Sequence, residues 1–222
     1  MNSNHGSLGW SSPCWRQHLC VSVLGGCLLA IRCAGQDILH IGFDGPPIQP
    51  PGTAALVQRY DEGGITFTPI GLTGFVRVGE NPDPRQPDNG SSYLQALLGS
   101  DLRFQFIRLT PFDLISVDLA EYSTVVPDAV TVHFVGYRAD GSIVTQDFTT
   151  DGIIDGTGPG VDFETFHFGP EFSNLSRVEI PTFGWSLDNL VVVPEPGTWS
   201  LIILGAGVAT ILYRNRRRGQ FT

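Results

Sequence analysis

The sequence predicts an all-β fold: an antiparallel β-sandwich of the jelly-roll kind, with an N-terminal signal helix before it and a single C-terminal transmembrane helix after it. Short β-rich runs fill the middle of the chain, separated by Gly, Pro, Asn and Asp, and no long run there has helical periodicity. The two flanking helices are expected because each end of the chain carries an apolar run next to arginine.

Residues 1–35 are expected to be a signal peptide. Arg16 precedes an apolar stretch over 19–31, which has the length of a signal-peptide hydrophobic region and is short for a membrane span. Small residues at Cys33 and Gly35 suit cleavage by signal peptidase after Gly35. The mature chain would then contain none of the four cysteines, which excludes cysteine catalysis and zinc–thiolate sites.

Ten β-strands are expected in the ectodomain, residues 36–192. Their ranges are 38–43, 64–69, 74–78, 102–109, 113–120, 130–138, 142–149, 161–168, 175–180 and 185–193. Strands of this number and length, with turn residues between them, are typical of a two-sheet sandwich or jelly roll.

Two of these runs alternate between apolar and polar side chains. Leu102, Phe104 and Phe106 share one face, and Arg103, Gln105 and Ile107 share the other. Ile115, Val117 and Leu119 oppose Ser116 and Asp118. Such alternation predicts a sheet with one face on the core and the other toward water.

Two connections between the strands stand out. Asp140-Gly141 predicts a hairpin over 130–149 with a type I′ turn, whose positive φ angles match the twist of the strands. The polar segment 79–92 is expected to be a long loop that either lines a ligand face or is only a connection.

The middle of the chain is strongly acidic. Residues 36–193 contain seven arginines and 21 acidic residues, a formal net charge of −14. This charge excludes nucleic acid and anionic lipid surfaces as partners, and it suits divalent cations or simple solubility. The sequence has no His-Glu-x-x-His motif and no P-loop, and 184–188 lacks the second glycine of a nucleophile elbow. We therefore expect no enzymatic activity.

The end of the chain, residues 193–218, combines three features. Pro194, Glu195 and Pro196 come first, and the uncharged run 196–213 would span about 27 Å as a helix. A basic cluster follows at once and would stay on the cytoplasmic side of a membrane: Arg214, Arg216, Arg217 and Arg218. The prolines prevent a continuous helix, so Glu195 is expected in an extended, exposed segment that a processing enzyme can bind.

This order of features resembles the PEP-CTERM sorting signal of exopolysaccharide-producing Gram-negative bacteria. The resemblance implies an exosortase-type enzyme as a partner, transient anchoring in the inner membrane, and cleavage near Pro194–Pro196. It also implies delivery to the cell envelope or to an extracellular matrix such as a biofilm. The alternative is an ordinary tail anchor that carries two prolines.

The ectodomain also resembles those of many PEP-CTERM proteins, which are similar to galactose-binding-like jelly rolls. The matching stretches are Phe43-Asp44-Gly45, Tyr60 with Gly64-Ile65-Thr66-Phe67, and Leu187-Asp188-Asn189-Leu190. In such folds the first and last strands are neighbours, so the resemblance implies a structural Ca²⁺ held by Asp44 and Asp188. Alternatively, Asp44 belongs to a turn and Asp188 accepts local hydrogen bonds. The segment 151–162 has EF-loop spacing but an apolar third position, and is expected to be a glycine-rich loop.

Four aromatic residues are candidates for stacking on sugar rings: Trp185, Tyr93, Tyr122 and Tyr137. Trp185 begins the last expected strand and is alternatively a core residue. The sequence thus predicts an exported, non-enzymatic envelope or matrix protein that associates with extracellular polysaccharide. Two alternatives stay open: a permanently membrane-anchored surface adhesin and a secreted carbohydrate-active enzyme.

Overall fold

The computed structural model describes residues 37–48, 53–71, 73–80, 82–83, 85–96, 101–123, 125, 128–154 and 162–195, together with Gly207 and Thr210. The expected signal helix and nearly all of the expected transmembrane run therefore lie outside the described residues. Within the described ranges, no helix is both long enough and apolar enough to cross a membrane.

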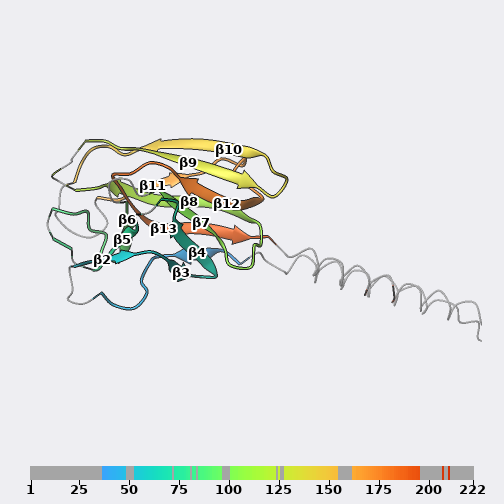
Figure 1. Cartoon of the computed structure of the whole chain (residues 1–222). Coiled ribbons are helices and arrows are strands. Elements are labelled where there is room, and N and C mark those ends of the chain that lie inside the picture. The colour runs from blue at the N-terminus through green and yellow to red at the C-terminus, as the bar shows by residue number, and fades with distance from the viewer. Residues whose placement is uncertain are drawn as a thin grey trace, which may run out of the picture. The chain divides into compact units, whose positions relative to one another are not determined.

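The described part of the chain is built from antiparallel strands (Figure 1). In chain order they are β1 (Leu39–Ile41), β2 (Ala54–Val57), β3 (Tyr60–Glu62), β4 (Ile65–Pro69), β5 (Phe75–Val78), β6 (Tyr93–Gln95), β7 (Leu102–Phe106), β8 (Phe112–Glu121), β9 (Thr131–Arg138), β10 (Ile143–Thr149), β11 (Glu164–His167), β12 (Leu175–Ile180) and β13 (Trp185–Pro194). The all-β prediction is confirmed, and each of the ten expected ranges contains a strand. The sequence missed β2, β3 and β6, which are only three or four residues long.

The strands form two layers. One layer has the order β10-β9-β12-β7-β4-β3. The other layer begins with the order β11-β8-β13. The far edge of β13 pairs with two strands, β1 along one part and β6 along another. From β6 the layer continues through β5 to β2. A single pair, Leu175 with Phe112, joins the layers. The predicted sandwich is therefore confirmed.

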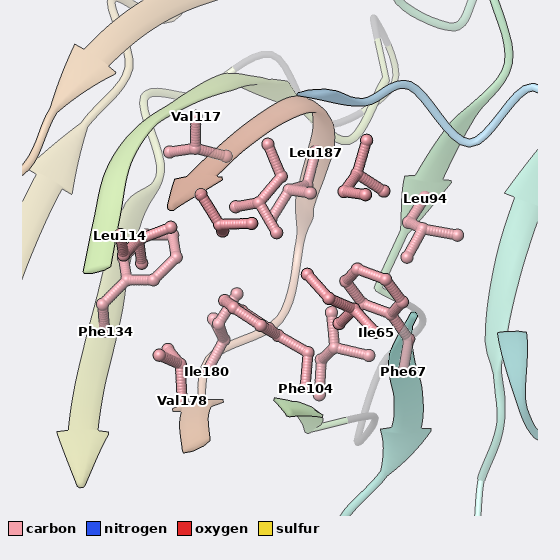
Figure 2. Close-up of a cluster of buried hydrophobic side chains, with 14 of the residues drawn as sticks. Ile65, Phe67, Leu94, Phe104, Leu114, Val117, Phe134, Val178, Ile180 and Leu187 are labelled. Carbon is pink, nitrogen blue, oxygen red and sulfur yellow. The ribbon is translucent and has the colours of Figure 1, made fainter. Parts of the chain in front are cut away.

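The core lies between the layers and uses alternate residues of each strand. Phe104, Val178 and Phe134 enter it from one layer, and Leu119 and Leu187 enter it from the other. Figure 2 shows side chains of both layers meeting around Phe104 and Leu187. This burial is the main source of stability, because each fully buried large apolar side chain contributes about 1.5–3 kcal/mol.

Alternation holds along β7 as predicted but breaks within β8. Leu102, Phe104 and Phe106 are buried, whereas Ile115, expected on the core face, is 41% exposed. The ladder between β8 and β13 shifts register there, so Leu114 and Val117 both face the core with Ile115 turned out between them. The alternating sequence of β8 does not indicate where such a bulge lies, so the outward position of Ile115 could not be predicted from it.

The hairpin of β9 and β10 is confirmed, but its turn is not of type I′. Gly141 has a φ of 87°, and Asp140 is not among the residues with positive φ, although a type I′ turn needs positive φ at both. The amide of Gly141 donates to Arg138 O, and the amide of Arg138 donates to Ser142 O. The loop is thus a type I turn with glycine in the bulge position.

Candidate functional site

The first and last strands are neighbours, as the ectodomain resemblance implied. Ile41 of β1 faces Leu190 of β13, and Asp44 follows β1 directly. Asp188 lies where β13 shifts register against β8, and Asn189 next to it has a φ of 46°. Because Leu187 points into the core, Asp188 points to the outer face of its layer. The two aspartates lie close enough for the charge of Asp44 to raise the pKa of Asp188.

Asp188 is completely buried, yet it is an acid without an arginine partner among the described residues. Its Oδ2 accepts hydrogen bonds from Asn89 Nδ2 and, at 2.8 Å, from Ser91 Oγ. Its Oδ1 accepts the amide of Asn189 at 2.7 Å. Burial raises the pKa of Asp188 to about 7, although these three donors favour the charged form.

Asn89 and Ser91 belong to the polar segment 79–92, most of which is described. The segment covers Asp188 on the outer face, and backbone amides on either side of Asn89 and Ser91 hold it in place. The amide of Asp88 donates to Asp162 Oδ2 at 3.1 Å, and the amide of Ser92 donates to Asp44 Oδ1 at 3.2 Å. We refer to Asp44, Asn89, Ser91 and Asp188 as the Asp188 site.

Arg77 of β5 holds the Asp44 side of this site, a role that no pattern in the sequence indicated. Its guanidinium is buried and donates to the carbonyls of Phe43 at 2.6 Å, Pro46 at 2.7 Å and Gly45 at 3.0 Å. Phe43 itself has a φ of 58° and is fully buried. A fixed fork of donors on three carbonyls of residues 43–46 holds the turn that carries Asp44.

The stretches quoted for the ectodomain resemblance meet in the fold. The ring of Phe43 packs against Tyr60 at 5.8 Å and Phe67 at 5.1 Å between ring centroids. The hydroxyl of Tyr60 accepts the amide of Gly45 at 3.0 Å. Through these contacts the separate stretches build one corner of the sandwich beside the Asp188 site.

The oxygen chemistry of the Asp188 site fits a hard cation. Ca²⁺ binds carboxylate, amide and hydroxyl oxygens, and the four side chains of the site supply all three. The second expectation, local hydrogen bonds to Asp188, describes only the amide of Asn189, because Ser91 and Asn89 come from a distant part of the sequence.

A second acidic group was not predicted as a site. Glu121 of β8, Asp151 after β10 and Glu164 of β11 place one carboxylate oxygen each within 4.8 Å of one another. We refer to these three residues as the Glu121 cluster. The sequence predicted a glycine-rich loop with EF-like spacing over 151–162. The acidic partners of Asp151 come instead from β8 and β11. Residues 155–161 lie outside the described residues.

Two of the four aromatic candidates cannot meet a ligand at the surface. Trp185 and Tyr93 are fully buried, so the expectation of exposed rings at these positions is corrected. Trp185 packs in the core and donates from Nε1 to Thr182 O at 2.8 Å, while Tyr93 packs edge-on against Phe163. Tyr122 and Tyr137 are half-buried.

Tyr137 belongs to a polar platform on the outer face of three neighbouring strands, β9, β12 and β7. The guanidinium of Arg177 lies 3.6 Å from the centre of the Tyr137 ring. Glu179 accepts from Tyr137 Oη at 3.0 Å and from Arg103 Nη2 at 2.8 Å. Burial raises the pKa of Glu179, but its hydrogen bonds from arginine and tyrosine lower it more, and the pKa lies below its ordinary value.

The Pro-Glu-Pro motif begins inside the fold. Pro194 is the last residue of β13, opposite Phe112, and the amide of Glu195 donates to Pro111 O at 2.9 Å. Glu195 directly follows the last strand, and it is half-buried and not fully exposed as expected. Pro196 and the basic cluster lie outside the described residues.

Comparisons with known proteins identify the end of the chain. Residues 192–218 match the family described as the PEP-CTERM protein-sorting motif, so the expected sorting signal is confirmed. None of the curated proteins matches this sequence.

Among solved structures, the chain is similar to a family 11 carbohydrate-binding module from Clostridium thermocellum in complex with a beta-1,3-1,4-mixed-linked tetrasaccharide. The identity is 11%, the TM-score is 0.27, and the match covers 71% of this chain and 95% of that one. A second structure of a family 11 module, from a cellulosomal cellulase of the same organism, gives 11% identity and a TM-score of 0.27 and covers 73% and 97% of the two chains.

Proposed function

We propose that this protein is an exported envelope or matrix component whose β-sandwich is a non-catalytic module, delivered by its C-terminal sorting signal. The observation that carries the proposal is the match of residues 192–218 to the PEP-CTERM motif, continuous with the last strand of an acidic sandwich. PEP-CTERM signals belong to exported proteins. The remaining steps are part of the proposal: signal peptidase cuts after Gly35, the run 196–213 anchors the chain transiently in the inner membrane, and an exosortase-type enzyme cuts near Pro194–Pro196.

The junction between sandwich and signal supports release of an intact domain. β13 ends at Pro194, and its apolar residues Val192 and Val193 remain in the sandwich if the cut falls after that proline. Beyond it, the described contact between backbones is the Glu195–Pro111 hydrogen bond. A processing enzyme would need to displace about one hydrogen bond, net about 1 kcal/mol, to grip this segment.

The test is the intact mass of the protein purified from its native host. We expect a mass that ends near Pro194–Pro196. A mass that includes Arg218 would contradict release and favour the permanently anchored adhesin.

A variant pair tests whether the motif directs the sorting. Glu195→Ala should leave the uncleaved chain in the membrane fraction, whereas Glu80→Ala, an exposed acid elsewhere on the sandwich, should be processed as the wild type is. If Glu195→Ala has the wild-type mass and location, Glu195 does not direct processing.

Association with extracellular polysaccharide is the second part of the proposal. An outward-facing tyrosine stacked with an arginine, beside a carboxylate, offers both a flat surface and hydrogen-bonding groups to a sugar. Sedimentation of the full chain with polysaccharide from its host should therefore be weaker for Tyr137→Ala than for the wild type. Tyr122→Ala tests the other half-buried candidate. Equal binding by both variants and the wild type would remove these residues from the proposal.

The carbohydrate-active enzyme is tested on the same polysaccharides. Release of new reducing ends by the wild type, abolished by one carboxylate substitution, would overturn the non-catalytic proposal. No release, together with binding, is the result that we expect.

A structural Ca²⁺ at the Asp188 site is the third part of the proposal. Asp44 and Asp188 would be its charged ligands, and neutralising the buried carboxylate would offset the cost of its burial. The Tm of the full chain should then fall when EGTA is added, and it should fall less for Asp44→Asn. Asp140→Asn, in an exposed turn, is the control. An equal EGTA effect in Asp44→Asn and the wild type would contradict calcium at this site.

A further inference from the structure

Glu121 is an acidic residue on the core-facing side of β8. Val117 and Leu119, two and four positions earlier on β8, point into the core, and Glu121 continues the same face. Its partner across the ladder is Trp185, which is also buried in the core. Glu121 is completely buried, and a buried carboxylate is costly unless it is paired.

Two more carboxylates meet it at this end of the sandwich. Glu164 is opposite Leu119 on the neighbouring strand β11, so its side chain lies on the same face of the layer as Glu121. Asp151 comes from the segment that follows β10. One oxygen from each of the three carboxylates lies within 4.8 Å of the others.

The backbone of residues 151–153 holds the three carboxylates by one oxygen each. Gly152 donates to Glu121 Oε1 at 2.7 Å, Asp151 donates to Glu164 Oε1 at 2.7 Å, and Ile153 donates to Asp151 Oδ1 at 2.9 Å. Because Gly152 is next to Asp151, its bond to Oε1 directs the carboxylate of Glu121 toward the other two acids.

The second oxygen of Glu121 has no partner among the described residues. Oε2 is buried and, in the part of the chain that the structure describes, makes no hydrogen bond. None of the described arginines forms an ion pair with Glu121, Asp151 or Glu164, and the sequence contains no lysine.

We propose that the Glu121 cluster binds a divalent cation, and that this cation is Ca²⁺. Two oxygens that each lie about 2.4 Å from one calcium ion are at most about 4.8 Å apart, which agrees with the spacing of the three carboxylates. Three carboxylates without histidine or cysteine favour a hard cation over zinc or copper. The ion would pair the free oxygen of Glu121 and join β8 and β11 to the segment after β10.

Burial and the charges of Asp151 and Glu121 raise the pKa of Glu164, as expected where like charges gather without a counter-ion. This site is separate from the Asp188 site: Glu121 points to the inner face of β8, and Asp188 points to the outer face of β13. The proposal stands whether or not the sorting signal acts as proposed above.

The experiment titrates the purified full chain with CaCl₂ alone, by calorimetry, and follows its Tm with and without EGTA. We expect a Tm rise of roughly 5–10 °C when free calcium is about 100-fold above its Kd. Glu164→Gln and Glu121→Gln should each weaken binding about tenfold or more, because each removes a charged ligand. MgCl₂ should give a smaller Tm rise, since Mg²⁺ demands a regular octahedral site.

Two controls keep the result specific. Glu80→Gln, an exposed acid, should bind calcium as the wild type does, and Asp44→Asn should retain the binding that depends on Glu164. The proposal is overturned if Glu164→Gln and Glu121→Gln, both folded by circular dichroism, bind calcium with the wild-type Kd and show the wild-type Tm rise. Loss of all calcium binding in Asp44→Asn alone would likewise overturn it and assign the calcium to the Asp188 site.

Discussion

The Asp188 site and the Glu121 cluster each contain a buried carboxylate, but the two carboxylates differ in their hydrogen-bond partners. Both bury a carboxylate on the adjacent strands β13 and β8, one on the outer face and one on the inner face. Among the described residues, Asp188 receives three hydrogen bonds from neutral donors, whereas Glu121 receives one and its Oε2 has no partner. The hydrogen bonds of Asp188 hold a polar loop in place. The unpaired oxygen of Glu121 is the reason for proposing a cation at that cluster.

The largest effect should come from removing the acceptor at Asp188. Asp188→Ala leaves the donors of Asn89, Ser91 and Asn189 without their acceptor, and should cost about 2–4 kcal/mol of unfolding free energy, a Tm loss of roughly 5–15 °C. Thermal unfolding of the full chain measures it. Asp118→Ala, which removes the half-buried register partner, should cost less. A loss within 2 °C of zero would mean that the loop is held by other contacts.

The second effect is the pH dependence of Asp188. Its pKa rises from 3.8 to about 7 on folding, so the native state holds the proton more tightly than the unfolded chain. The stabilisation from this proton is complete below about pH 4 and is lost as the pH rises to about 7, at a slope of at most about 1.4 kcal/mol per pH unit. Urea unfolding in calcium-free buffer should show a weaker fall from pH 5 to pH 8 in Asp188→Asn than in the wild type. Parallel profiles would contradict the assignment to Asp188.

The third effect has the opposite sign to the first. Glu121→Gln keeps an acceptor for Gly152 and replaces the unpaired charge with an amide that can donate toward the neighbouring acids. In calcium-free buffer it should raise the unfolding free energy by about 1 kcal/mol. A loss as large as that of Asp188→Ala would show that the Glu121 carboxylate is already satisfied, and the contrast between the two sites would disappear.

The smallest effect should be that of Glu164→Gln without calcium. The variant keeps the acceptor for Asp151 and removes one of three like charges, so the stability at pH 7 should change by no more than about 0.5 kcal/mol. Because the pKa of Glu164 is raised on folding, the wild type should lose a little stability as pH rises through that pKa, and the variant should not. Urea unfolding at pH 4.5 and pH 7 compares the two chains. A large loss at both values would point to a structural role for the charge.

The sequence identified the strands whose pattern is local. Runs of β-branched and aromatic residues gave ten of the strands, and the alternation in β7 gave its buried face, because every second side chain of a strand points the same way. It did not reveal β2, β3 and β6, whose few residues depend on their neighbours for pairing. Nor did it reveal the bulge at Ile115, which changes the face of one residue without changing the composition.

For the sites, the sequence by itself determined the sorting motif, since Pro-Glu-Pro, an apolar run and clustered arginines follow one another along the chain. It also brought Asp44 and Asp188 together through a resemblance. Only the tertiary structure assembled the Glu121 cluster, whose members are separated by up to 43 residues and meet through strand pairing and the segment after β10. It also decided that Trp185 and Tyr93 are core residues. Burial depends on what the rest of the chain places on each side of a strand, and this is a property of the folded arrangement.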